Sequence, residues 1–307
     1  YQPTDIILNW KLQERVVINN PVEAKKLEIT GNSVFSKEEL GEFPLELPEG
    51  KVNNYEVLKA LDDAFKKYLL NGYSKVKFNS LGVENETLTV EVEEGIVEEI
   101  TINGNTRTNP MVIRNRLRID EGQPYNQKLI DSSKRRILQL GYFNKAEPKT
   151  EDLGNGLKLA FDIKEKSRLG SARGALTWSN GGLAGNLTLT RKNILGLGQN
   201  ISLSIERGFS LSSPLSGSIE WKNYLYPPEY DYSDFRIYRN IEERDDGNIK
   251  KVGGEFGLGY PIGPNFSLDL SYTLESVDKM GTSDGDSISN IISTSLTYDN
   301  RLNPLFP

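Results

Sequence analysis

Cysteine and histidine are both absent from this sequence of 307 residues. Without them there is no thiol nucleophile, no disulfide, no imidazole general base and none of the usual zinc ligand sets. The absence of cysteine says little about the cellular compartment, since many exported proteins lack it. Among the remaining residues no nucleophile–base constellation can be recognised, and we predict a protein that is not an enzyme, with no catalytic residues, no metal and no cofactor.

Long apolar runs are missing as well. No stretch reaches the roughly 18 apolar residues of a membrane-crossing helix, so none is predicted. Strands that cross a membrane as a barrel escape such a search, because only half of their residues are apolar. The 37 lysines and arginines stand against 43 aspartates and glutamates, a net charge of −6. This balance gives no indication of a nucleic-acid partner.

The region 167–307 contains segments in which apolar and polar residues alternate strictly. Because successive strand side chains point to opposite faces, each segment has one apolar and one polar face. The segments have about the length of tilted membrane-crossing strands, roughly nine to eleven residues, which favours a membrane barrel over a soluble sandwich. We predict eight strands, near residues 169–178, 184–193, 199–207, 215–223, 232–240, 250–260, 265–276 and 287–298.

Aromatic residues support the barrel interpretation. Barrels in membranes carry aromatic girdles near both ends of their strands. We assign seven residues to such girdles: Trp178, Trp221, Tyr224, Tyr226, Tyr260, Tyr272 and Tyr298.

An internal repeat occupies the region before these strands. Residues 24–32 and 97–105 match, and each predicts a short strand that ends in Gly-Asn, at Gly31 and Gly104. A short helix and a long helix follow each turn, the long ones near 54–71 and 126–140. Each long helix ends in a glycine and an aromatic residue, which is typical of a left-handed helix cap. Two further strands close each unit, near 75–81 with 87–93, and near 145–151 with 157–164.

The order of residues also predicts where the first short helix begins and which face of the first long helix is apolar. Ser36 with Glu39 three residues later predicts a capping box at the first short helix. Within the long helix of the first unit, Leu61, Phe65 and Leu69 contribute to one apolar stripe.

The strand–helix–helix–strand–strand repeat resembles the polypeptide-transport-associated (POTRA) domain. Two such repeats leading into alternating strands resemble BamA-type outer-membrane assembly factors. The segment 193–198, Asn-Ile-Leu-Gly-Leu-Gly, is similar to the family's Asn-x-x-Gly-x-Gly turn. The end of the chain is similar to the family's motif after the eighth strand, and its turn residues here are Asp299, Arg301, Asn303 and Pro304.

The resemblance implies an α+β fold of β-α-α-β-β repeats followed by the N-terminal half of an antiparallel transmembrane β-barrel. We expect residues 1–20 to be the last strand of a preceding POTRA repeat, with one extended stretch at 6–12. Residues 21–96 are expected to form one POTRA domain and residues 97–166 the POTRA domain adjoining the barrel. Residues 167–307 would be strands 1–8, and since family barrels have sixteen strands, we expect the chain to be a fragment.

In the family, the first barrel strand forms a seam that opens and templates client strands. Small residues there would weaken the packing of the seam. The resemblance therefore assigns a lateral gate to Leu169, Gly170, Ser171, Ala172, Arg173, Gly174, Ala175, Leu176, Thr177 and Trp178. We expect Arg173 to face inward and to pair with Glu206 or Glu220.

The second strand of each repeat is expected to be an exposed edge. Family members dock partners or client strands on such edges, although charged residues on an edge also guard against aggregation. The edge residues are Lys75, Val76, Lys77 and Phe78 in the first repeat, and Lys145, Ala146 and Glu147 in the second.

The resemblance implies insertion of other barrel proteins into the outer membrane, with the repeats in the periplasm. The partners would be unfolded outer-membrane barrel proteins, periplasmic lipoproteins or chaperones, and the lipid bilayer. A TamA-like insertase and a two-partner-secretion polypeptide pore remain alternatives, and a passive porin would not explain the repeats.

Overall fold

The computed structural model describes residues 7–9, 15–17, 26–40, 45–46, 54–84, 87–179, 182–209, 213–224, 230–242, 247–263, 265–280 and 286–299. Contacts divide the chain into two units. The first comprises Tyr1–Thr101, Ile119–Ile130 and Thr150–Leu159, and the second Ile102–Arg118, Asp131–Lys149 and Ala160–Pro307. Across the described ranges, no helix is long and apolar enough to cross a membrane.

Two short strands lie near the N-terminus, where we expect one extended stretch. Strand β1 (Ile7–Asn9) pairs antiparallel with β2 (Arg15–Val17). The pairing satisfies backbone groups that a single extended segment would leave without partners. The assignment of residues 1–20 to a preceding repeat stays a prediction.

The first repeat is a four-stranded sheet with two helices. Strand β3 pairs in parallel with β6 and antiparallel with β4, and β5 pairs antiparallel with β6, giving the order β4-β3-β6-β5. The short strand β4 was not predicted. The elements are β3 (Lys26–Thr30), α1 (Lys37–Leu40), β4 (Leu45–Glu46), α2 (Asn54–Leu70), β5 (Lys77–Glu84) and β6 (Thr87–Glu93).

One face of α2 covers this sheet. Leu61, Ala64 and Tyr68 are buried and pack in one cluster with the inward-facing residues of β3 and β6. Phe65 packs against this cluster, as its place in the apolar stripe predicts. The stripe is narrower than expected, however, because Leu69 is 36% exposed.

The predicted helix ends are confirmed. The Ser36 hydroxyl accepts from the backbone N–H of Glu39 (3.2 Å), and the Glu39 carboxylate accepts from the Ser36 N–H (2.9 Å). These two bonds form the capping box. Gly72 and Gly141 end the two long helices with φ of 97° and 76°, in the left-handed region that glycine tolerates.

The second repeat has the same order of elements without a counterpart of β4. Its sheet order is β7-β9-β8, so β8 is an edge strand. Ile130, Ser133 and Ile137 lie on one buried face of the long helix, as the periodicity predicts. The elements are β7 (Val97–Asn103), α3 (Pro110–Arg114), α4 (Gln127–Gln139), β8 (Phe143–Asp152) and β9 (Leu157–Glu165).

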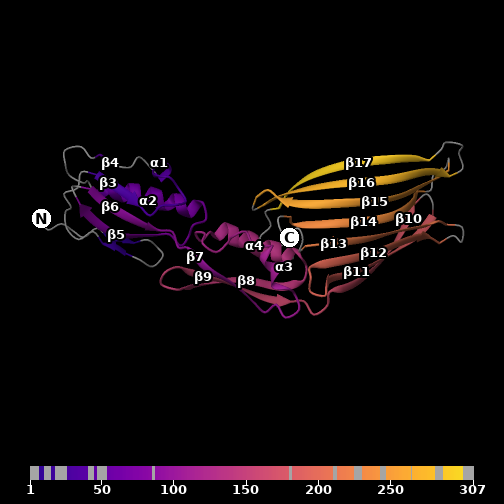
Figure 1. Cartoon of the computed structure of the whole chain (residues 1–307), viewed down its shortest axis with the longest axis horizontal. Coiled ribbons are helices and arrows are strands. Elements are labelled where there is room, and N and C mark those ends of the chain that lie inside the picture. The colour runs from indigo at the N-terminus through magenta and orange to yellow at the C-terminus, as the bar shows by residue number, and fades with distance from the viewer. Residues whose placement is uncertain are drawn as a thin grey trace. The chain divides into compact units, whose positions relative to one another are not determined.

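Eight antiparallel strands, β10 to β17, form one sheet in chain order (Figure 1). All eight were predicted, most of them to within two residues at each end. Hydrogen-bonded neighbours are consecutive in sequence, which the short connections between them require. The strands are β10 (Gly170–Ser179), β11 (Gly182–Ile194), β12 (Gln199–Gly208), β13 (Leu215–Asn223), β14 (Tyr232–Glu242), β15 (Asn248–Pro261), β16 (Phe266–Met280) and β17 (Ser287–Tyr298).

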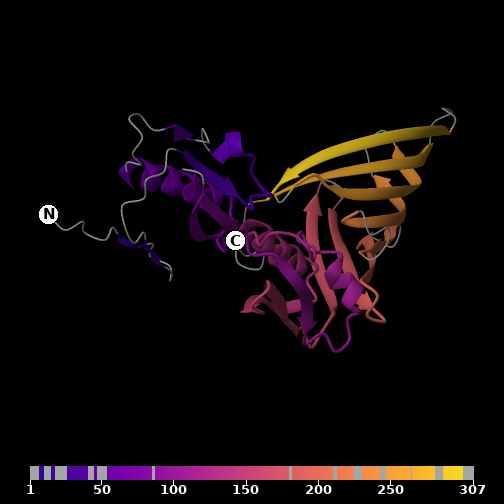
Figure 2. The ribbon, with the colours of Figure 1, turned by 60° about the vertical axis from the view of Figure 1, so that its left-hand side comes forward.

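The register of this sheet separates an apolar face from a polar face. Leu203, Ile219 and Ile237 lie in one row across β12, β13 and β14, while Ser204 faces Ser218 on the other side. The sheet is curved (Figure 2). Its apolar side chains are widely exposed, which is costly in water and suited to hydrocarbon. The predicted fold class, α+β repeats followed by an antiparallel sheet of alternating strands, is confirmed.

The aromatic prediction is correct only in part. Tyr298 and Tyr260 lie at or next to strand ends and are about half exposed, as expected. Tyr272 lies in the middle of β16, where its hydroxyl donates to Asn290 Oδ1 (2.6 Å). Tyr224 packs against Tyr142 of the second repeat, so it serves a protein contact and its assignment to a girdle is wrong. Tyr226 lies outside the described residues.

Candidate functional site: the first strand and its junction with the second repeat

The first strand of the large sheet, β10, has β11 as its only partner among the described strands. Leu169 lies just before the strand, and its carbonyl accepts from the N–H of Lys192 (2.8 Å). Side chains at residues 171–178 are all exposed, with Leu176 at 70% and Trp178 at 79%. Since most of the strand consists of glycine, alanine and serine, little side-chain bulk covers its backbone.

The bond between Lys192 and Leu169 also sets which backbone groups of β10 face its open edge. Hydrogen-bonded and non-hydrogen-bonded pairs alternate in an antiparallel ladder. Odd-numbered residues such as Ser171 and Ala175 therefore direct their N–H and C=O groups to β11. Even-numbered residues such as Ala172 direct theirs away from β11, toward the open edge.

The expected charge pair of Arg173 is not found. Arg173 lies opposite Thr188, and Thr188 lies opposite Ser204 in the next strand. Glu206 is therefore in the next same-face row, and within the described residues Arg173 forms no ion pair with Glu206 or Glu220. The prediction failed because alternation gives the face of a residue but not its row.

The two repeats each present an edge strand, as expected, at β5 and β8. Lys75 and Val76 precede β5, whose described range begins at Lys77. Inward and outward residues alternate along both edges. Val76 and Ala146 are buried, Phe78 packs against the core, and Lys75 and Lys145 are exposed.

Two of the charged edge residues form ion pairs. Lys77 lies 3.9 Å from Asp152, and Glu147 accepts from Lys134 at 3.2 Å. The docking role of both edges stays a prediction.

The turn between β11 and β12 is fixed to the second repeat by Asn193. This residue is buried and has a φ of 53°, a conformation that asparagine tolerates better than most residues. Its amide donates to the Thr108 hydroxyl (2.8 Å), and its carbonyl oxygen accepts from the N–H of Gly198 (2.9 Å). The side chain therefore joins the turn to the loop before α3.

The glycines of this turn are required by close approach. A Cβ on Gly196 would overlap the carbonyl oxygen of Arg107, and one on Gly198 would lie 2.9 Å from a methyl carbon of Val112. The N–H of Asn109 also donates to the Gly196 carbonyl (2.9 Å). The Asn-x-x-Gly-x-Gly segment is thus a docking turn, in which Asn193 is required by its hydrogen bonds and Gly196 and Gly198 by close approach.

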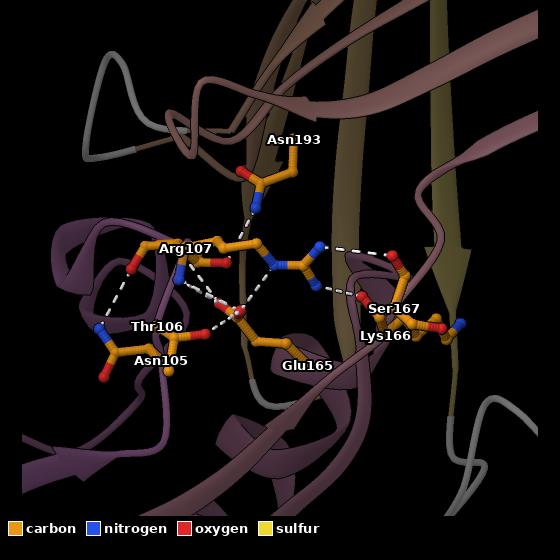
Figure 3. Close-up of polar contacts among 8 residues, drawn as sticks. Asn105, Thr106, Arg107, Glu165, Lys166, Ser167 and Asn193 are labelled. Atoms are coloured by element: carbon orange, nitrogen blue, oxygen red, sulfur yellow. Dashed lines mark hydrogen bonds and ion pairs between the residues drawn. The ribbon is translucent and has the colours of Figure 1, made fainter.

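Glu165, at the end of β9, holds the facing loop of the repeat (Figure 3). Its carboxylate accepts from the Thr108 N–H (2.8 Å), the Thr106 hydroxyl (3.0 Å) and the Arg107 Nε (3.2 Å). The Arg107 guanidinium continues to the carbonyls of Lys166 and Ser167. One side chain therefore connects the loop after β7 with the segment that leads into β10.

These bonds alter the acidity of Glu165. Burial opposes its ionisation, since its side chain is only 6% exposed. Hydrogen bonds from Thr108, Arg107 and Thr106 outweigh that effect and lower the pKa of Glu165 to about 2. The carboxylate is therefore ionised throughout the physiological range.

Glu94 performs the same task in the first repeat. Its carboxylate accepts from the N–H groups of Ser33 (2.9 Å) and Val34 (3.0 Å), and from the Tyr68 hydroxyl (2.6 Å). Burial opposes its ionisation, but bonds from Ser33 and Tyr68 lower the pKa of Glu94 on balance. Neither glutamate was assigned a role from the sequence, although they occupy similar places in the two repeats: Glu94 follows Asn32 by 62 residues, and Glu165 follows Asn105 by 60.

The Gly-Asn pairs at the matching ends of β3 and β7 now have a physical reason. A Cβ on Gly31 would lie 2.6 Å from the carbonyl oxygen of Val92, and one on Gly104 would overlap that of Ile163. The following asparagines donate to carbonyls three residues on, from Asn32 to Phe35 (2.7 Å) and from Asn105 to Thr108 (3.1 Å).

The predicted turn motif at the end of the chain is described only at its first residue. Asp299 accepts from the Gln139 side chain (3.1 Å), and its N–H donates to the Asn265 carbonyl (2.8 Å). Arg301, Asn303 and Pro304 lie outside the described residues. No group of three or more acidic or other ligating side chains within the described part is placed to hold a metal ion.

Comparisons with known proteins agree with this geometry. A family model of the POTRA domain, described as a surface antigen variable number repeat, matches residues 96–166. The outer membrane protein assembly factor BamA of Neorickettsia risticii is 28% identical over 208 residues, 66% of this chain. BamA of Buchnera aphidicola is 25% identical over 304 residues, 90% of this chain. The chain is a BamA-like protein.

The BamA-like chain spans 27% and 48% of the length of these two relatives. Among solved structures, CdiB from Escherichia coli matches with a TM-score of 0.61 at 15% identity, covering 92% of this chain and 57% of its own. That likeness concerns the fold alone. BamA homologues are outer-membrane proteins with periplasmic POTRA domains.

Proposed function

We propose that this chain assists the assembly of outer-membrane proteins, with β10 as the strand on which a client strand pairs. BamA-like assembly factors are in general not enzymes, and the proposed activity needs no catalytic residue, metal or cofactor. The activity lowers the free-energy barrier to membrane insertion. A strand that enters hydrocarbon must pair its backbone N–H and C=O groups, because each group left unpaired there is costly.

The edge of β10 that has no partner among the described strands is the observation that carries this proposal. Its even-numbered backbone groups face away from β11, and the residues that carry them at 170, 172 and 174 are the small Gly170, Ala172 and Gly174. Strand addition at such an edge supplies main-chain hydrogen bonds that do not depend on the client's sequence. Gly170 and Gly174 also reduce side-chain packing along the strand, which favours opening.

The repeats are the proposed receiving part. The strands β5 and β8, each at an edge of its sheet in the described part of the chain, would pair through their backbone groups with unfolded barrel proteins or with periplasmic lipoproteins and chaperones. The exposed apolar face of the large sheet is assigned to the lipid bilayer of the outer membrane. No described feature favours a TamA-like insertase or a polypeptide-secretion pore over this function, and none calls for a nucleic-acid partner.

The test uses the chain reconstituted in liposomes with a urea-unfolded barrel protein as client. Client folding is followed by its heat-modifiable mobility on gels. Ala172→Pro removes one N–H from the open edge while leaving the ladder to β11 intact, since proline is tolerated at strand edges. Ala172→Val is the matched control, because it changes the side chain and keeps the N–H.

We expect Ala172→Pro to slow client folding by about tenfold, in line with the cost of placing proline where a ladder donor is needed. The valine variant should fold the client at the rate of the unmodified chain. Equal rates for both variants and the unmodified chain would refute templating on β10. No acceleration by the unmodified chain over empty liposomes would refute the assembly function itself.

A further inference from the structure

Four arginine side chains of the second repeat gather around the turns that join strands of the large sheet. Arg116 is 4% exposed and donates to the carbonyls of Tyr224 (3.2 Å) and Tyr230 (3.3 Å). Arg135 and Arg136 are adjacent on α4, and Arg118 donates to the carbonyl of Gly263 (3.3 Å). All of these residues belong to one compact unit.

The charges in this group do not balance. Asp231 accepts from Arg136 and lies 3.6 Å from Arg116, so a single carboxylate serves two guanidinium groups. Within the described residues, Arg118 and Arg135 donate only to neutral oxygens, the Gly263 carbonyl and the Asn265 side chain (2.6 Å). Four guanidinium groups thus face two carboxylates, those of Asp231 and Asp299.

The buried donors are also incompletely used. The Nε atoms of Arg116 and Arg118 are buried and have no acceptor among the described atoms. A buried donor without a partner is costly, and more so when it carries charge. Burial, and then the neighbouring Arg136 charge, lower the pKa of both arginines to about 10. A bound anion at this place would offer the buried donors an acceptor and would raise the pKa of both arginines.

A cavity of about 60 Å³ lies within the group. One water needs only about 10–15 Å³ by the same measure, so there is room for an ion of several heavy atoms. One face of α4 lines it, with side chains spaced as neighbours along a helix. The lining comprises Arg118, Ser132, Arg135, Arg136, Gln139, Asp231, Gly263, Asn265, Phe266, Ser267 and Asp299.

We infer that this cavity is a binding site for a phosphate group, held by Arg118 and Arg135. Guanidinium groups bind phosphate through paired charge-assisted hydrogen bonds, and the hydroxyl of Ser267, which also lines the cavity, adds a neutral partner. Asp231 does not oppose the anion strongly, because Arg116 and Arg136 already neutralise it. This site is independent of strand pairing on β10 and goes beyond the proposed assembly function.

Two sources offer this chemistry, a phospholipid headgroup and a free phosphate ion. Strand ends in a membrane sheet lie at headgroup depth, and the cavity is lined by residues that follow such ends, Gly263 and Asp299. The experiment separates the two sources by offering each probe alone.

The chain is purified in an uncharged maltoside detergent without phosphate buffers. Binding is measured by titration calorimetry with inorganic phosphate, and separately with short-chain phosphatidylglycerol. The variants are Arg118→Gln and Arg135→Gln. Arg168→Gln is the charge-matched control, since Arg168 is exposed and does not line the cavity.

We expect each cavity variant to weaken binding by about tenfold or more, the usual effect of losing a charged hydrogen bond. Arg168→Gln should bind as the unmodified chain does. Asp299→Asn removes a negative charge and should tighten binding, which keeps the test decisive if an arginine variant fails to fold. Binding of phosphate alone identifies the free ion, and binding of the lipid only identifies the headgroup.

Binding of either probe supports the site if Arg118→Gln and Arg135→Gln weaken it and Asp299→Asn tightens it. The inference is overturned if neither probe binds the unmodified chain, or if binding is the same in the cavity variants and in Arg168→Gln. Weaker binding by Asp299→Asn would overturn it as well.

Discussion

Replacement of Glu165 by glutamine tests whether one carboxylate holds the junction loop. Glutamine keeps the size of the side chain and one oxygen acceptor, but removes the charge that strengthens the bonds from Thr106, Arg107 and Thr108. The pKa of Glu165 is lowered from 4.5 to about 2. Each pKa unit corresponds to about 1.4 kcal/mol, so the folded structure favours the ionised form by about 3 kcal/mol.

The sign of this effect fixes its pH dependence. A carboxylate with a lowered pKa stabilises the folded state fully above its unfolded pKa, and the stabilisation is lost as the pH falls toward the folded pKa. The contribution of the ionised Glu165 to the stability of the folded state is therefore complete at pH 7. It declines as the pH falls below about 4.5 and is absent below about 2.

Amide hydrogen exchange in the full chain, followed by mass spectrometry at pH 7, measures this local stability. In Glu165→Gln, the amides of Arg107 and Thr108 should exchange up to about 100-fold faster, the rate equivalent of about 3 kcal/mol. Glu94→Gln is the matched control, because it removes the same type of bond from the loop at Ser33 and Val34. Unchanged exchange at Arg107 and Thr108 in Glu165→Gln would refute the reasoning.

Two further substitutions, Gly104→Ala with its control Gly122→Ala, and Asn193→Ala, are followed by the same exchange measurement. Gly104→Ala should destabilise the turn after β7 by about 2–4 kcal/mol, since its Cβ would overlap the Ile163 carbonyl and its φ is 87°. Gly122→Ala has a similar φ of 86° with nothing within 4 Å, so only the backbone strain of about 1 kcal/mol is expected, and equal effects would contradict the steric argument. Asn193→Ala removes two buried hydrogen bonds and should destabilise the docking turn by about 2 kcal/mol; normal exchange at Gly198 in this variant would show that the turn is held by other contacts.

The sequence by itself determined most elements of this protein, although not the short strand β4 or the pairing of β1 with β2. Alternation between neighbours gave all eight strands of the large sheet, because a strand with one apolar face needs no long-range information to be recognised. The capping box at Ser36 and the helix-ending Gly72 and Gly141 are local for the same reason. The edge position of β5 and β8 followed from the order of elements in the resembling family.

Tertiary structure decided which residues meet. Thr108 and Glu165 are 57 residues apart, and Arg116 meets the Asp231 carbonyl from 115 residues away. No periodicity links such positions, so the glutamate bonds and the arginine cavity could not be read from the sequence. Arg173 shows the same limit: its face was correct, but its row depends on the register between strands, which hydrogen bonds set only in the folded sheet.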